Sequence, residues 1–410
     1  MTTTTRPPTA IEDLPFLDVT AAGFTWEDPA VSAAREQCFA ARTPAGVVVL
    51  RHAEVAELLR DVRLTPDLRP VVERAGATSG PLHDVAALAL QARSRADHRR
   101  VRSGLVSRQF DACKVAGVRP FIRTAARELT RQLAAAGPCD FVRAFSDVLP
   151  TRVICHMLGV PFDDYGLFHG WAMDLSLILA LDCDARLRSR VEECLAGLSS
   201  YVEALVRERA AGPGGGDVIS CLLRAREDGI LAPDELRTLV VQLMVAGTHT
   251  TSRQLGLAMV AFASHPEQWT RLRDRPDLVE GAVDEILRWC PTTATIGFPR
   301  VAADDLLYQG LRIPAGTNVW LGVHAANRDP RVHTDADTFD IGAVRREAPL
   351  LNFGGGSHHC PGALLARTEL TEALTQLTAA LGPPEITGPI RWRPPLGNIG
   401  PETLPLRFRP

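Results

Sequence analysis

Apolar side chains recur at three- and four-residue spacing along much of the chain, which is the period of amphipathic α-helices. The pattern is clear over residues 97–110 and in segments that begin near Val118, Pro150 and Arg186. A glycine-rich stretch at 210–216 lies between two helical patterns and has the composition of an exposed loop. This part of the chain is therefore predicted to be mainly helical.

One helical segment is much longer than the others. Pro233 opens it with two acidic residues in the first turn, and no helix breaker follows before Pro266. Its first half, LRTLVVQLMVAG, is apolar on nearly every side, and a helix of that kind is normally buried all round. We expect this helix to pass through the middle of the molecule.

The pattern changes after Val301, where short apolar runs alternate with turn signals such as Pro314-Ala315-Gly316. The stretch from Ile390 to Phe408 is again strand-like and is interrupted by proline and glycine. We predict a mainly α fold: a helical body with small peripheral β-sheets and one long central helix. Because no linker-like composition divides the chain, we expect residues 1–410 to form a single domain.

Composition narrows the functional classes. Hydrophobic residues make up 46% of the 410 residues, enough for a large core, and the net charge of −3 is spread without a basic run. This distribution argues against a nucleic-acid partner. The sequence opens without a signal-peptide core, and its apolar runs are too short to span a membrane. We expect a soluble, cytoplasmic and monomeric protein without a membrane partner.

The stretch FGGGSHHCPG at 353–362 places three glycines, two histidines and one cysteine together. A zinc site is one interpretation, but consecutive ligands do not converge easily on one ion. The nine cysteines also contain no Cys-x-x-Cys pair, which argues against a zinc ribbon or a disulfide framework. A nucleophilic cysteine would need a base and an orienting group, for which there is no local signature. A third interpretation is a glycine loop that leads into a helix at Pro361.

The glycines in this loop would let its backbone approach a flat, bulky partner closely. The sulfur of Cys360 would lie at the start of a helix, where free N–H groups and the positive helix end stabilise a thiolate. These are the properties of an axial haem ligand. The loop resembles the haem-binding loop of the cytochrome P-450 family, and all fixed positions of that pattern are present: Phe353, Gly354, Gly356, His358, Cys360 and Gly362.

The resemblance implies haem (heme b, iron protoporphyrin IX) as the cofactor and Cys360 as the axial ligand of its iron. It further implies that Phe353 packs against the sulfur, that Gly354 and Gly362 belong to the cofactor-binding loop, and that His358 bonds a haem propionate. His359 falls on a variable position of the pattern.

Other segments resemble the same family, from residue 97 onwards. His98 and Arg102 lie four apart on one predicted helix, where the family directs a histidine and an arginine at the haem propionates. Arg300 resembles a third propionate ligand. The segment 324–330, HAANRDP, resembles a strand-to-helix segment of the family that is structural rather than catalytic.

Glu285 and Arg288 lie three residues apart and share one face of a predicted helix. An exposed pair of this kind contributes little to stability. Here it resembles the family's Glu-x-x-Arg, a buried structural pair that usually has a second arginine as its third member. Ala343 stands where that arginine is expected, followed by Arg345 and Arg346, so the third member is left open.

Residues 246–251, Ala-Gly-Thr-His-Thr-Thr, lie in the long helix. Taken alone, back-bonding threonines would merely bend the helix, and a glycine there costs about 1 kcal/mol. The stretch resembles the family's Ala-Gly-x-acid-Thr-Thr, in which glycine and threonine open a groove beside the haem and the acid relays protons. The implied catalytic group consists of Ala246, Gly247, His249, Thr250 and Thr251.

His249 occupies the position of the family's acid, while Thr250 keeps the alcohol. A histidine with its unperturbed pKa of about 6.5 can pass protons at neutral pH. Three interpretations stay open. His249 replaces the acid as the relay; or it turns away to an ion pair or the substrate, and water or substrate supplies protons; or proton delivery is retuned for radical coupling.

By position, residues 292–298 should run over the edge of the haem, and we expect Thr295 and Ile296 to face the substrate. Three further segments should form the remaining walls: residues 64–90, Met173–Leu181 and Asn398-Ile399. These walls are mostly apolar with a few hydroxyl groups. They suit a medium-sized, largely hydrophobic ligand.

The resemblance implies a bacterial-type haem-thiolate monooxygenase that activates dioxygen and hydroxylates a hydrophobic substrate of secondary metabolism. NAD(P)H-derived electrons would come from a separate ferredoxin or flavodoxin, because no flavin or iron–sulfur motif is found in the sequence. One alternative is oxidative C–C or C–N coupling, or another non-insertion oxidation, at the same haem. Another is a haem-binding partner protein without turnover, against which the retained Thr250 argues.

Overall fold

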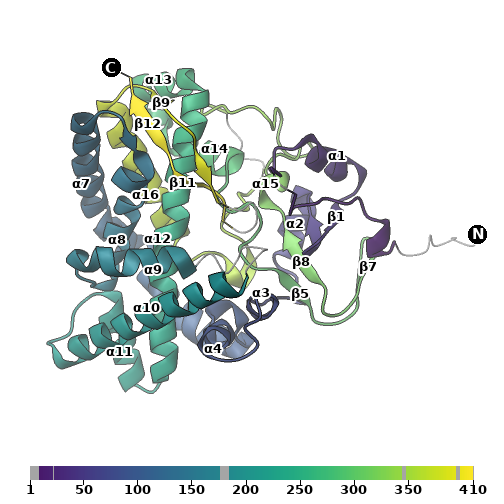
Figure 1. Ribbon diagram of the computed structural model, residues 1–410, viewed down its shortest axis with the longest axis horizontal. Helices are drawn as coiled ribbons and strands as arrows, with labels where there is room; N and C mark the ends of the chain where they lie inside the picture. Colours follow the sequence, from purple (N-terminus) through teal and green to yellow (C-terminus); the bar gives the residue numbers. More distant parts are fainter. Residues whose placement is uncertain (1–8, 22, 176–183, 344–347, 394–397, 410) are drawn as a thin grey trace, which may run out of the picture.

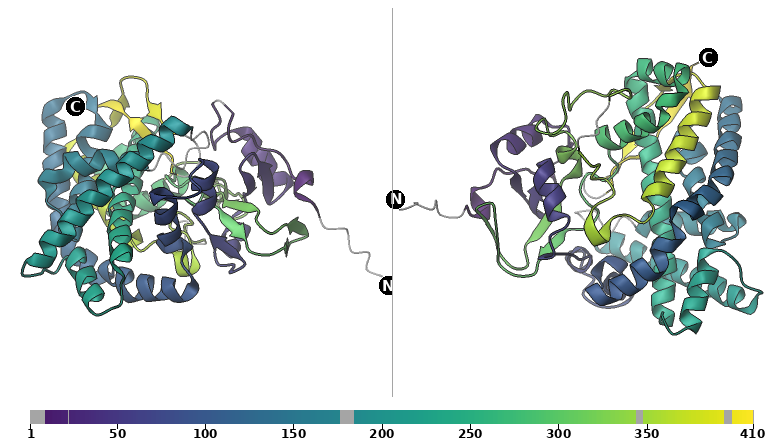
Figure 2. Two further views of the ribbon diagram at one scale, coloured as in Figure 1. Left: turned by 60° about the horizontal axis from the view of Figure 1, so that its bottom comes forward. Right: turned by 180° about the vertical axis from the view of Figure 1, so that it is seen from behind.

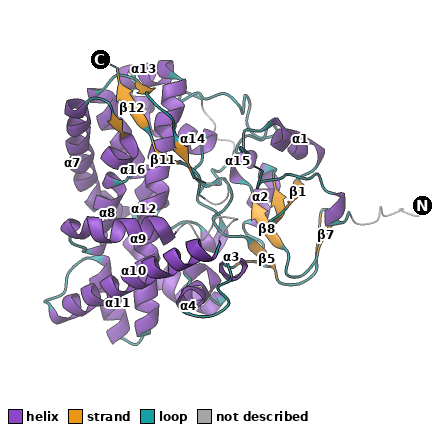
Figure 3. Ribbon diagram, in the orientation of Figure 1, coloured by secondary structure: helices purple, strands orange, loops and turns teal. Residues whose placement is uncertain are grey.

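The computed structural model describes residues 9–21, 23–175, 184–343, 348–393 and 398–409. Most of these residues are helical, and the strands form small sheets at the periphery (Figures 1 and 3). The mainly α architecture predicted from the sequence is confirmed.

The helices follow in chain order: α1 (Pro29–Gln37), α2 (His52–Leu58), α3 (Arg69–Arg74), α4 (Pro81–Leu88), α5 (Arg95–His98), α6 (Ser107–Gln109), α7 (Ala112–Ala136), α8 (Val148–Leu158), α9 (Tyr165–Leu175), α10 (Ala185–Ala211), α11 (Val218–Glu227), α12 (Pro233–Ser264), α13 (Pro266–Asp274), α14 (Val279–Trp289), α15 (Val323–Ala326) and α16 (Ala363–Ala380). The strands are β1 (Ala40–Thr43), β2 (Gly46–Val49), β3 (Leu64–Pro66), β4 (Cys139–Asp140), β5 (Arg300–Ala302), β6 (Leu306–Tyr308), β7 (Leu311–Ile313), β8 (Asn318–Leu321), β9 (Pro384–Ile386), β10 (Arg391–Trp392), β11 (Pro401–Thr403) and β12 (Pro405–Phe408).

Helix α12 is the predicted central helix. It runs for 32 residues from Pro233 to Ser264. Its start is stabilised by Glu235, whose carboxylate accepts a hydrogen bond from the Ala232 N–H, so the side chain satisfies a free donor next to the first turn. It crosses the helical body with α8, α9 and α10 packed against it (Figures 1 and 2). Most of its residues are buried, as its sequence predicts, while Ala246 near its middle is exposed.

A five-stranded sheet in the order β1-β2-β8-β5-β3 lies at the end of the molecule away from α7 and α11 (Figure 1). It joins distant parts of the sequence, because β2 pairs in parallel with β8 and β3 pairs antiparallel with β5. The pairing fixes the chain around Arg300, at the start of β5, against the first seventy or so residues.

The C-terminal strands β9 and β11 pack against α12. Gly256 of α12 and Pro401 of β11 lie so close that a Cβ on the glycine would be 2.6 Å from the proline Cγ. A larger residue at 256 would therefore push β11 away from the helix. Gly400 has a φ of +151° and lies against the side chain of Arg253.

The predicted helix over 97–110 is interrupted. Helix α5 ends at His98, a wider π-helical segment runs from Arg99 to Val106, and α6 completes the element. Such widened turns occur most often at functional sites.

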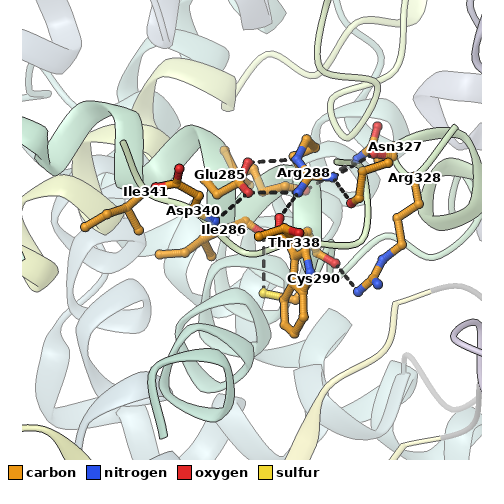
Figure 4. A network of polar contacts seen from close by, with 12 residues as sticks. Glu285, Ile286, Arg288, Cys290, Asn327, Arg328, Thr338, Asp340 and Ile341 are labelled. Atoms are coloured by element: carbon orange, nitrogen blue, oxygen red, sulfur yellow. Dashed lines mark hydrogen bonds and ion pairs between the residues drawn. The ribbon is translucent and has the colours of Figure 1, made fainter. Parts of the chain in front are cut away.

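Glu285 and Arg288 of α14 form the predicted pair, and both side chains are buried (Figure 4). The Arg288 Nε and Nη2 atoms donate to the two Glu285 oxygens over 2.7 and 2.8 Å. The arginine also donates to the carbonyls of Asn327 at 3.0 Å, Ala336 at 2.6 Å and Thr338 at 2.9 Å. Glu285 accepts a further bond of 3.0 Å from the Asp340 N–H.

These main-chain groups of residues 327–340 surround the pair. Arg345 and Arg346 lie outside the described residues. Arg271 of α13 pairs with Asp340 at 2.7 Å, but both side chains are more than a third exposed. The buried Glu285–Arg288 pair thus holds residues 327–340, which precede the glycine loop, through their main-chain carbonyls.

Among the described helices, none is both long and apolar enough to cross a membrane.

Replacing Arg288 by leucine should lower the free energy of unfolding by about 3–5 kcal/mol, because it leaves the Glu285 carboxylate buried without its counter-charge. Urea unfolding followed by circular dichroism measures the loss. Arg271→Leu breaks an exposed pair instead and should cost less than about 1 kcal/mol. Equal losses in the two variants would contradict the assigned role of Arg288.

Candidate functional site

The middle of α12 has an open face. Ala246 is exposed and Thr250 is partly exposed, although most neighbouring residues of this helix are buried. The Thr250 hydroxyl donates to the Ala246 carbonyl over 3.1 Å. Its oxygen lone pairs are therefore directed at the same open face. Thr251 lies on the buried side of the helix.

Gly247 is explained by helix packing. A Cβ at this position would lie 2.7 Å from the Ile154 side chain of α8, closer than real Cβ atoms approach a neighbour. The glycine therefore lets α8 and α12 approach closely, in addition to any groove on the open face. This contact accounts for a helix-weakening residue at the centre of the longest helix.

His249 is buried, with 2% of its surface exposed. The backbone of Ala172 in α9 acts to raise the pKa of the ring, and Nε2 has no partner among the described residues. Burial, reinforced by the positive charges of Arg253 and Arg393, holds the pKa of His249 well below its usual 6.5. The ring is therefore neutral at neutral pH.

The glycine loop turns back on itself before α16. The Cys360 N–H donates to the Phe353 carbonyl over 2.7 Å, and Gly354 and Gly356 have φ angles of +70° and +61°. These left-handed conformations explain both glycines. Burial raises the pKa of the Cys360 thiol, while a hydrogen bond from the Gly362 N–H and the charge of Arg102 act to lower it. The sulfur thus has the donors that favour a metal-bound thiolate.

Basic side chains gather beside this loop. The rings of His98 and His358 lie 4.3 Å apart, and Arg102 donates to the His359 carbonyl over 2.6 Å. Arg300 is 3% exposed, and its Nε has no partner among the described residues. Burial lowers the pKa of Arg300 to about 10. Burial and the charges of His98, Arg300 and Arg102 lower the pKa of His358 to about 4.

This cluster fits the carboxylates of a haem. The four groups come from α5, the π-helical segment, β5 and the glycine loop, and they repel one another. A ligand that carries two carboxylates beside the loop would relieve this repulsion and would give the orphaned Arg300 N–H an acceptor. Cys360, the open face of α12 and the cluster together match a flat, dianionic, metal-bearing group. Among the described residues, no group of three or more His, Cys, Asp or Glu could hold a metal ion by itself.

The expected substrate residues differ in exposure. Thr295 is completely buried at 0% exposed, and its hydroxyl has no partner among the described residues. Ile296 is partly exposed, and its N–H bonds the Leu321 carbonyl. Phe298, which the sequence did not single out, is partly exposed as well. Ile399 is partly exposed and packs against the smaller core cluster that contains Ala294.

The structure describes one of the predicted substrate walls fully and another only in part. Residues 64–90 form β3, α3 and α4, and the Leu90 N–H bonds Gln242 of α12 over 3.2 Å. Of Met173–Leu181, residues 176–181 lie outside the described residues.

Sequence reasoning missed the polar pair Arg253 and Gln254 on α12. Both are buried, at 3% and 2% exposed. Their signal in the sequence is a charged residue and an amide directly after TTS, inside a helix that is otherwise apolar. That signal marks polar groups that need buried partners, but it does not say which partners.

Comparisons with known proteins agree with this geometry. Residues 169–379 match the family model described as Cytochrome P-450. Luteothin monooxygenase of Streptomyces thioluteus is 45% identical, covering 100% of this chain and 99% of that protein. Mycinamicin IV hydroxylase/epoxidase of Micromonospora griseorubida is 37% identical, covering 76% of this chain and 77% of that protein. The crystal structure of CalO2 has a TM-score of 0.89 and 28% identity, covering 97% of this chain and 100% of that one.

Arg300→Met should speed the loss of haem by roughly ten- to a hundredfold, since a charge-assisted hydrogen bond contributes about 1.5–3 kcal/mol. Transfer of haem to an excess of apomyoglobin measures the rate. Arg99→Met removes an exposed arginine next to His98 and serves as the control, for which the wild-type rate is expected. A wild-type rate in Arg300→Met would show that Arg300 does not hold the cofactor.

Proposed function

The chain belongs to the cytochrome P-450 family and is a haem-dependent monooxygenase, and we propose that it oxidises luteothin or a molecule of similar size and polarity. The observation that carries this substrate class is the 45% identity to luteothin monooxygenase over the whole chain. The largely apolar segments expected around the substrate support it. We also propose that residues 1–410 act as one catalytic unit.

In this proposal, Cys360 binds the iron, and the cluster of His98, Arg102, Arg300 and His358 binds the propionates. Bound there, haem would supply the iron centre at which dioxygen is activated. Phe353, Gly354 and Gly362 would belong to the loop that holds it. The open face of α12 at Ala246 and Thr250 would face the bound group.

Thr250 is proposed to direct protons to the oxygen side. Its hydroxyl is tied to the Ala246 carbonyl as a donor, so it can accept a hydrogen bond from water on the open face and pass a proton on when the bond to the carbonyl switches. Monooxygenation consumes two protons and two electrons per dioxygen, with one oxygen atom entering the substrate and the other leaving as water. A controlled proton supply is therefore part of the reaction.

The two electrons are proposed to come from NAD(P)H through a separate ferredoxin or flavodoxin, because no flavin or iron–sulfur motif is found in the sequence. We further propose that the protein works as a cytoplasmic monomer with a small-molecule substrate.

Purified protein with NADPH, a ferredoxin and its reductase should convert luteothin, and under ¹⁸O₂ the product should gain one labelled oxygen atom. Mass spectrometry measures the label. Cys360→Ala is the negative control, because it lacks the sulfur that would bind the iron. A product without label would favour the non-insertion alternative. A spin-state shift on luteothin binding with no NADPH consumption would favour a haem protein without turnover.

His249→Ala tests the role of the buried ring. If His249 relays protons, the variant should form roughly tenfold less product per NADPH and more hydrogen peroxide. The essential proton-transfer groups of enzymes contribute about 10² to 10⁴, and water can partly replace the ring. Wild-type coupling in His249→Ala would eliminate the relay interpretation.

A further inference from the structure

Gln254 lies on α12, four residues after Thr250, and is buried with 2% of its surface exposed. Its Nε2 donates to the Cys290 carbonyl over 2.9 Å. Its Oε1 accepts from the Thr292 N–H over 2.9 Å. One side-chain amide therefore bonds the main chain on both sides of Pro291, where α14 has just ended.

The two main-chain groups depend on this amide. Cys290 is the C-terminal cap of α14, so its carbonyl has no donor in the helix, and Pro291 has no N–H to offer. The Thr292 N–H begins the segment 292–298 that should run over the haem edge. A buried donor or acceptor left without its partner costs about 1–3 kcal/mol. The loop is thus held at one position relative to α12.

Thr292 also links the segment 292–298 to the C-terminal segment by two hydrogen bonds. Its hydroxyl donates to the Ile399 carbonyl over 2.8 Å, and the Ile399 N–H donates to the Thr292 carbonyl over 2.7 Å. Thr293 and Asn398 form an antiparallel bridge beside these bonds. Arg253, the neighbour of Gln254, donates to the Asn398 carbonyl over 3.3 Å. Two expected substrate walls are therefore fixed to α12 through one buried turn of that helix.

We propose that Gln254 is a positioning residue for site selectivity. It sets the distance between the helix that carries Thr250 and the segments that carry Ile296 and Ile399, and so decides which carbon atom of the substrate is oxidised. The inference rests on the proposed function, because it assumes that these segments line the substrate. A displacement of about 1 Å at such walls is enough to change a reaction on the order of a hundredfold.

Gln254→Glu is a matched test because the side chains have nearly the same shape. A protonated glutamic acid has one O–H donor and one carbonyl acceptor, so it can replace both bonds of the amide. The ionised form can only accept, so the Cys290 carbonyl loses its donor and faces a negative charge. Burial raises the pKa of such a carboxyl, so the switch should fall between about pH 5 and pH 8. Gln254→Leu removes both bonds at all pH values.

The readout is the ratio of oxidation products from luteothin, with product per NADPH as the second measure. At low pH Gln254→Glu should give the wild-type ratio, and at high pH its ratio should change by about tenfold toward that of Gln254→Leu. The wild-type ratio should not vary with pH. Gln268→Leu is the control: Gln268 also bonds a main-chain N–H, that of Ile341, in a partly buried position on α13. It should leave the ratio unchanged.

A second probe separates this inference from the proposed function. The binding constants of 4-phenylimidazole and imidazole, measured by the shift of the Soret band, compare a wide and a narrow ligand in the same pocket. Gln254→Leu should change their ratio by about tenfold, while Gln268→Leu should not. The expected change in the ratio of binding constants does not depend on luteothin being the substrate. If Gln254→Leu fails to load haem, the pH dependence of Gln254→Glu decides the question.

Wild-type product and ligand ratios in haem-loaded Gln254→Leu would overturn the inference. So would a Gln254→Glu variant whose thermal stability changes with pH while both ratios stay constant, because that result is what a purely structural role predicts.

Discussion

The burial of α12 is the constraint on which the site depends. Where this helix is buried, its polar side chains need partners inside the protein. Main-chain groups of other segments bond two of its central polar residues: the Asn398 carbonyl is one partner of Arg253, and Cys290 and Thr292 bond Gln254. Ser252 instead donates to the Asp147 carboxylate. Buried polar groups thus tie these segments to the helix that carries Thr250.

The sequence could predict whatever depends on local chemistry. The spacing of apolar residues and the two prolines predicted the end of α12 to within one residue, because Pro233 and Pro266 act on the backbone directly. The glycine loop was recognisable from its residue pattern, and the structure adds that Gly354 and Gly356 have left-handed conformations, which favour glycine. The carbonyls around Arg288, the burial of Thr295 and the partners of Gln254 were not predictable. They arise where segments distant in the sequence meet, and no local pattern encodes such a meeting.

The cofactor cluster shows how a cofactor can contribute to stability. His98, Arg102, Arg300 and His358 are brought together from four elements, and their mutual repulsion and burial lower the pKa of His358 and disfavour its protonation. The protein alone therefore holds these groups at a cost. A dianionic ligand removes that cost only in the folded state, so its binding and folding reinforce each other. Burial of Arg300 without an acceptor is reasonable for a protein that folds around its cofactor.

The charge of Arg253 bears directly on which residue can stand at position 249. His249 and Arg253 lie four apart on α12, so a carboxylate at 249 would face the guanidinium and be held in an ion pair. A neutral histidine avoids that pair, and Arg253 donates to the Asn398 carbonyl. The ring lies beside Ala172 of α9, the helix that also carries Met173 and packs against α12. A relay through His249 therefore depends on how α9 packs against α12.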